Sequence, residues 1–211
     1  MTEVLRNVAP FPQPVPARNP GGDCFACALT AVVRALFPER PIDFDAAWDL
    51  FKEKDSSGNE TLSHTWGSFE RVIWKLVGMD YPIEMRHDIV VPRIDLRHWS
   101  HPWWFSVPDG EWAYRLEAWL AAGWLAFAEM EYDGKGPYTR EGFINVIDHF
   151  IVLDGQRHLW KRFETGGGAA LEHETHVVCS ARGGRAYWIR TRDLLLKHGV
   201  AGLTLVRRDE R

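Results

Sequence analysis

Apolar residues in the first third of the chain recur every three or four positions, the spacing of one buried helix face. This pattern predicts a helix over residues 25–37, which Pro38 ends because proline cannot continue a helix. An aspartate cap signal precedes a second predicted helix over 44–54. A third is predicted over 65–78 with Gly78 as its stop.

The second half of the chain has short apolar runs separated by turn residues, which is typical of strands. The predicted strands cover residues 124–132, 144–155, 157–164, 174–180, 185–191 and 203–208. Asp154 and Gly155 predict a tight turn after the second of them. Two short helices are predicted over 111–123 and 193–199, and residues 80–110, with four prolines, are predicted to be irregular.

Helices that come first and strands that come later indicate the α+β class. We expect one domain over residues 1–211, because the chain length suits a single core. Within it we expect an extended Pro-rich arm over 1–20, a helical half over 21–110 and an antiparallel sheet half over 111–211. The helical half is expected to pack on the sheet.

The composition of the chain narrows the classes of partner and location that we expect. A net charge of −4 and an isoelectric point near 6.1 argue against a nucleic-acid partner, which needs a basic surface. Apolar runs are shorter than the roughly 18 residues of a membrane span, and the N-terminus lacks a secretory pattern, so we expect a cytoplasmic protein with no membrane partner. Three cysteines are an odd number, which favours reduced thiols.

Cys24 is the main candidate for chemistry. It follows Gly21 and Gly22 and directly precedes the first predicted helix, whose free amides and dipole favour a thiolate. The alternative is that Cys24 is a small buried apolar residue, as most free cysteines are. Cys24 and Cys27 form a C-x-x-C pair, but no second pair follows, so we expect no metal. No cofactor is expected either.

A cysteine nucleophile needs a base within hydrogen-bond reach. His149 is the leading candidate because it begins the apolar strand HFIVLDG, where a sheet presents polar residues at its rim. His176 begins a similar strand, THVVC, and is the main rival. Either histidine is far from Cys24 in sequence, so the fold must bring the pair together.

Three stretches together resemble a known family. They are GDCFACALTAV, then RLEAWLAAGWLAFAEMEY followed by DHFIVLDG, and VVCSARGGRAYWIRTRDLLLKHG. Their order and content are similar to papain-like cysteine peptidases, closest to the bacteriocin-processing, double-glycine-leader type. The resemblance implies a thiol on a helix facing a histidine on a sheet across a cleft, and a peptide or small amide substrate.

Three positions depart from that family. Phe25 stands where the family commonly has glycine after the nucleophile. The family's glutamine, which donates to the oxyanion, has no close counterpart, and Asn19 is the nearest amide. The orienting aspartate is replaced by Ser180, or by Glu164 in an alternative alignment.

These observations leave several functions open. The first is a cysteine peptidase or amide hydrolase that uses Cys24 and His149 through an acyl-thioester intermediate. The second is a papain-like fold that has lost catalysis and binds a protein partner or regulates one. A third is a cell-wall peptide hydrolase, which the D-C and H-F-I-V-L-D-G motifs also resemble. A likeness to arylamine acetyltransferases is set aside, because their histidine lies much closer to the cysteine.

Overall fold

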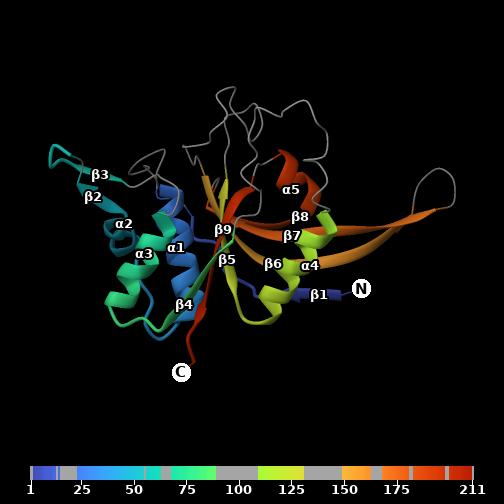
Figure 1. The fold of residues 1–211 in the computed structure, drawn as a ribbon, viewed down its shortest axis with the longest axis horizontal. Helices are drawn as coiled ribbons and strands as arrows, with labels where there is room; N and C mark the ends of the chain where they lie inside the picture. The colour runs from blue at the N-terminus through green and yellow to red at the C-terminus, as the bar shows by residue number, and fades with distance from the viewer. Residues whose placement is uncertain are drawn as a thin grey trace.

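The fold is an antiparallel sheet with helices on both faces (Figure 1). The computed structural model describes residues 2–12, 14, 23–54, 56–62, 68–88, 109–130, 149–162, 168–180, 183–197 and 200–210.

The main sheet has seven strands in the order β4-β9-β5-β6-β7-β8, with β1 paired to β6, and each described pairing is antiparallel. Its strands are β1 (Thr2–Leu5), β4 (Ile83–Asp88), β5 (Leu125–Met130), β6 (His149–Arg162), β7 (Ala169–Cys179), β8 (Arg185–Arg190) and β9 (Val200–Arg208). A separate hairpin joins β2 (Lys52–Lys54) to β3 (Glu60–Leu62). β6 and β7 extend beyond the rest of the sheet as a long arm (Figure 1).

Five helices lie among the described residues. They are α1 (Asp23–Leu36), α2 (Phe44–Leu50), α3 (Ser68–Gly78), α4 (Asp109–Ala121) and α5 (Thr191–Lys197). α1, α2 and α3 contribute to one buried apolar cluster, and α4 and α5 contribute to another.

Side-chain alternation along the central strands separates these two clusters. Phe127, Phe150 and Val152 lie in the cluster with α1, whereas Ala126 and Ile151 lie in the cluster with α4. Successive residues of a strand point to opposite faces, so each central strand serves both cores. The near-continuous apolar runs of β5 and β6 follow from burial on both faces.

The α+β class and most elements predicted from the sequence are confirmed. The structure contains the first predicted helix and the two short helices before β5 and after β8. It also contains predicted strands near residues 125, 150, 175, 187 and 205. The sheet also takes β1 and β4 from the N-terminal half of the chain, and α4 and α5 cover its second face.

Three local predictions are wrong. The helix expected over 44–54 ends at Leu50, because the following residues pair in the β2–β3 hairpin. The segment expected to be irregular contains β4, whose partner β9 is far away in sequence. The turn expected at Asp154–Gly155 does not form, because β6 continues through both residues with a shift in register.

Gly155 has a packing reason to lack a side chain. A Cβ at this position would lie 2.7 Å from Cβ of His176 and 2.8 Å from Cδ1 of Leu5. Both distances are too short for carbon atoms in contact, so the close approach of β1, β6 and β7 depends on glycine here.

We predict that Gly155→Ala lowers the free energy of unfolding by about 1–3 kcal/mol, the usual cost of overpacking. Gly78→Ala is the control, since its added Cβ would meet no described atom within 4 Å apart from its chain neighbours and the backbone of its own helix. It should be neutral or stabilising by up to about 1 kcal/mol. Urea unfolding followed by tryptophan fluorescence measures both, and equal stability of the two variants would contradict the packing argument.

Candidate functional site

The first turn of α1 lies against the first residues of β6. Cys24 is the second residue of α1, and the backbone N–H of Phe150 lies close enough to its Sγ to lower the pKa of the thiol. The rings of Phe25 and Phe150 meet edge to face, with their centroids 4.5 Å apart. His149 is the first residue of β6 and directly precedes Phe150. The fold therefore brings the thiol next to the strand residue that follows His149.

Phe25 belongs to the core. Its side chain is 1% exposed and also contacts Phe51, with ring centroids 5.5 Å apart. This large residue, at a position where papain-like peptidases commonly have glycine, therefore fixes the start of α1 on the sheet through apolar packing.

Burial dominates the chemistry of Cys24. The side chain is 4% exposed, and this desolvation raises the pKa of the thiol to about 12. The backbone amides of Phe150, Cys24 and Phe25 oppose the effect, because they stabilise the thiolate. The described surroundings of Cys24 therefore favour the protonated thiol at neutral pH.

The other two cysteines lie near the same helix end. Burial raises the pKa of Cys27 to about 12, and the negative charge of Asp23 adds to the rise. The thiol of Cys27 donates a weak hydrogen bond to the Pro12 carbonyl at 3.8 Å. None of the three cysteines, all within the described chain, forms a disulfide. No group of three metal-ligating side chains converges among the described residues.

Ser180 lies at the same end of the sheet as Cys24. It directly follows β7, whose Val178 pairs with Val152, so the strand register carries it to the level of Phe150. Its side chain is buried and lies close enough to Cys27 to lower the pKa of that thiol slightly. Its Oγ makes no hydrogen bond of normal geometry in the part of the chain that the structure describes. A buried hydroxyl without a partner is uncommon in folded proteins.

Glu164 and Asn19, the other two residues expected at the site, lie outside the described residues. Glu164 follows Arg162 at one end of β6, and His149 begins the other end. A strand of 14 residues is about 45 Å long. Arg162, the last residue of β6, is therefore far from His149, whereas Ser180 follows the end of β7 that pairs near the start of β6.

The rival base, His176, has a different partner. Its Nδ1 lies 2.6 Å from Oδ1 of Asp154, a fully buried carboxylate whose Oδ2 accepts the backbone N–H of Val8 at 2.7 Å. Trp188 packs against the imidazole with ring centroids 4.9 Å apart. This pair fastens the segment after β1 to the sheet. The sequence alone does not reveal this pair, because the Asp154–Gly155 dipeptide predicts a turn.

A second polar cluster was also missed. His158 places Nε2 at 2.8 Å from Oε2 of Glu117 and Nδ1 at 2.6 Å from Nδ1 of His173. If Glu117 accepts the Nε2 proton, Nδ1 of His158 is bare and accepts the proton of His173. The chain of contacts fastens the β6–β7 arm to α4. Its signal in the sequence is the cross-strand pairing of two histidines, visible only once the register is known.

No known protein family, curated protein or solved structure matches the chain. Among the described residues, no helix is both long and apolar enough to cross a membrane.

The raised pKa of Cys24 predicts how stability changes with pH. The folded state holds the thiol proton more tightly than the unfolded state, whose pKa is near 9.0. The tighter binding of this proton adds to the free energy of unfolding. The added stability is complete below pH 9 and is lost as the pH rises toward 12, at up to about 1.4 kcal/mol per pH unit. We expect the free energy of unfolding, measured with urea between pH 8 and 10.5, to fall less steeply with pH for Cys24→Ala than for the wild type.

Val33→Ala is the control for this measurement, since Val33 is buried on the same helix and does not titrate. It should lower stability equally at every pH. Identical pH slopes for the wild type and Cys24→Ala would show that the thiol pKa is not raised.

The Ser180 hydroxyl, which has no hydrogen-bond partner of normal geometry among the described residues, predicts an unusual substitution. Ser180→Ala removes this buried polar atom, so we expect no loss of stability, or a gain of about 1 kcal/mol. Thr175→Val is the comparison, because Thr175 Oγ1 donates to Gln156 Oε1 at 2.9 Å and its loss should cost about 1–2 kcal/mol. Chemical denaturation tests both, and a loss of about 1 kcal/mol or more for Ser180→Ala would show that its hydroxyl does have a hydrogen-bond partner in the folded protein.

Proposed function

We propose that the chain is a papain-like cysteine hydrolase that cleaves an amide bond in a peptide or small molecule. Cys24 is the nucleophile and His149 the base. The observation that carries the proposal is the contact of the first turn of α1 with the first residues of β6, through the Phe25 and Phe150 rings and the Phe150 N–H near Cys24 Sγ. This contact joins the start of α1 to the strand that His149 begins. A thiol at a helix start beside a histidine-bearing strand is the arrangement that the family resemblance implies.

The mechanism follows from these positions. His149 takes the proton of Cys24, and the thiolate sulfur attacks the carbonyl carbon of the amide. The C–N bond then breaks, the amine leaves with the proton held by His149, and the acyl group stays on sulfur as a thioester. Water, deprotonated by His149, attacks the thioester carbonyl and releases the acid and the thiol.

Two further residues support this chemistry. The amides of the first turn of α1, which already stabilise the Cys24 sulfur, are suited to stabilise a developing oxyanion, and Asn19 is the side-chain candidate beside them. Ser180 is the candidate to orient the His149 ring, because its buried hydroxyl lacks a described partner and lies at the same strand level.

A specific observation also favours the second function, a binding protein that has lost catalysis. Burial raises the Cys24 pKa to about 12, and an inert structural thiol has that character. The two functions differ in one property. An enzyme must hold Cys24 as a thiolate paired with imidazolium in mildly acidic solution, whereas a binding protein need not.

The rate of alkylation by iodoacetamide between pH 5 and 10 tests the proposal. The background is Cys27→Ser with Cys179→Ser, so that Cys24 is the only thiol. An isolated thiol of ordinary pKa is about 0.3% thiolate at pH 6, so an ion pair should raise the rate there by about 100-fold. We expect a low-pH plateau in this background.

His149→Gln should abolish the plateau and leave a single rise at alkaline pH. His176→Gln is the matched control, since His176 is paired with Asp154, and it should keep the plateau. A single alkaline rise in the background protein itself would reject the hydrolase and support the binding function.

A further inference from the structure

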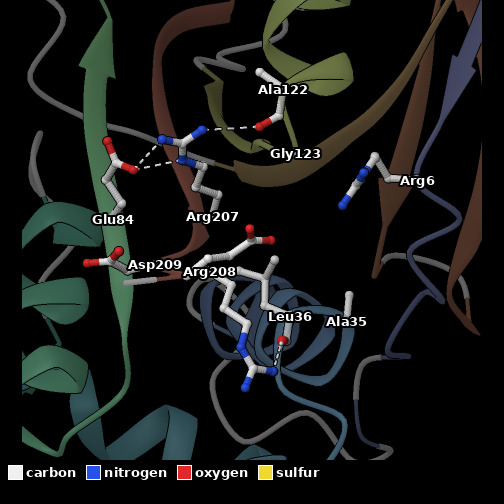
Figure 2. Close-up of a pocket in the computed structure, with 10 residues that line it drawn as sticks. Arg6, Ala35, Leu36, Glu84, Ala122, Gly123, Arg207, Arg208 and Asp209 are labelled. Carbon is white, nitrogen blue, oxygen red and sulfur yellow. Dashed lines mark hydrogen bonds and ion pairs between the residues drawn. The ribbon is translucent and has the colours of Figure 1, made fainter.

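A pocket of about 500 Å³ lies at the C-terminal end of α1, opposite the end that holds Cys24 (Figure 2). Its wall includes Ala35 and Leu36 from the last turn of α1, Ala122 and Gly123 after α4, and charged residues from β4, β9 and the segment after β1. α1 has 14 residues and is therefore about 20 Å long, so this pocket is separate from the Cys24 site. The volume is in the range of small-molecule sites.

Two arginines of the wall are held in fixed positions. Arg207 donates from Nε and Nη2 to Glu84 at 2.7 and 2.6 Å and from Nη1 to the Ala122 carbonyl at 3.3 Å, and it stacks over Trp124 (Figure 2). Arg208 pairs with Glu39 at 2.6 Å, at the end of β9. Both guanidinium charges are balanced by a carboxylate, but each keeps N–H groups that these contacts do not use.

Arg6 and Glu210 differ from Arg207 and Arg208 in their interactions. Both line the pocket, both are exposed to solvent, and neither side chain forms an ion pair or hydrogen bond with another described residue. Figure 2 shows the Arg6 guanidinium across the pocket from Arg207. After internal pairing, the pocket thus keeps one positive group and one negative group, with the carboxylate of Asp209 nearby.

We propose that this pocket binds a small zwitterion, a free amino acid or a dipeptide. Its carboxylate lies on Arg6, where guanidinium N–H groups suit a planar two-oxygen acceptor. Its ammonium lies on Glu210, and its short apolar part contacts Ala35 and Leu36. A simple anion fits less well, because it would face the carboxylates of Asp209 and Glu210.

The binding of alanyl-alanine by calorimetry tests the proposal. The Cys24→Ala chain is used, so that hydrolysis cannot remove the ligand and the result is independent of the proposed function. We expect a dissociation constant of about 1 mM or tighter. Acetyl-alanyl-alanine, alanyl-alanine amide and inorganic phosphate each lack one of the two charges and should bind at least 10-fold more weakly.

Two variants assign the charges. Arg6→Gln should weaken binding of alanyl-alanine at least 10-fold and remove the difference between the dipeptide and its amide. Glu210→Gln should weaken binding similarly and remove the difference between the dipeptide and its acetylated form. Arg71→Gln is the control, since Arg71 pairs with Glu53 on another part of the surface, and it should leave binding unchanged. Absence of binding at 10 mM, or equal binding of phosphate, would overturn the proposal.

Discussion

The contact between the first turn of α1 and the first residues of β6 determines the rest of the candidate site. Phe25 and Phe150 form its apolar part, and the Phe150 N–H, close enough to Cys24 Sγ to lower the pKa of the thiol, forms its polar part. Since Phe25 is fully buried, α1 cannot rotate without exposing a large aromatic side chain. The position of the thiol is therefore fixed by core packing, and the large hydrophobic residue beside Cys24 has a structural explanation.

The same packing opposes ionisation of the Cys24 thiol, which the proposed hydrolysis requires. A pKa raised from 9.0 to about 12 corresponds to about 4 kcal/mol against ionising the Cys24 thiol. An imidazolium in contact with the sulfur can offset such a cost, because a nearby opposite charge favours the charged form. Backbone amides supply part of the compensation in the described structure. The choice between an enzyme and a binding protein is thus a balance between desolvation of Cys24 and its pairing with His149.

Much of the fold was predictable because periodicity is a local signal. The α1 helix, the strands and the position of Cys24 at a helix start all follow from residues close in sequence. The errors involve partners far apart. β4 forms because β9 pairs with it, and Asp154 is a buried ion-pair residue because His176 lies opposite in the adjacent strand. The D-G sequence is typical of a turn, but burial of its aspartate against Val8 and His176 outweighs that local preference.

The two ends of α1 show how one helix can serve two different polar sites. At its start the free amides of Cys24 and Phe25 stabilise negative charge on sulfur. At its end the Leu36 carbonyl accepts a hydrogen bond from Arg208 Nη1 at 3.5 Å, as the negative end of a helix dipole favours a cation. Arg208 ends β9, which lies between β4 and β5 in the sheet and pairs with both. A ligand at the C-terminal end therefore contacts the same rigid core that positions Cys24, although about 20 Å of helix separates the two sites.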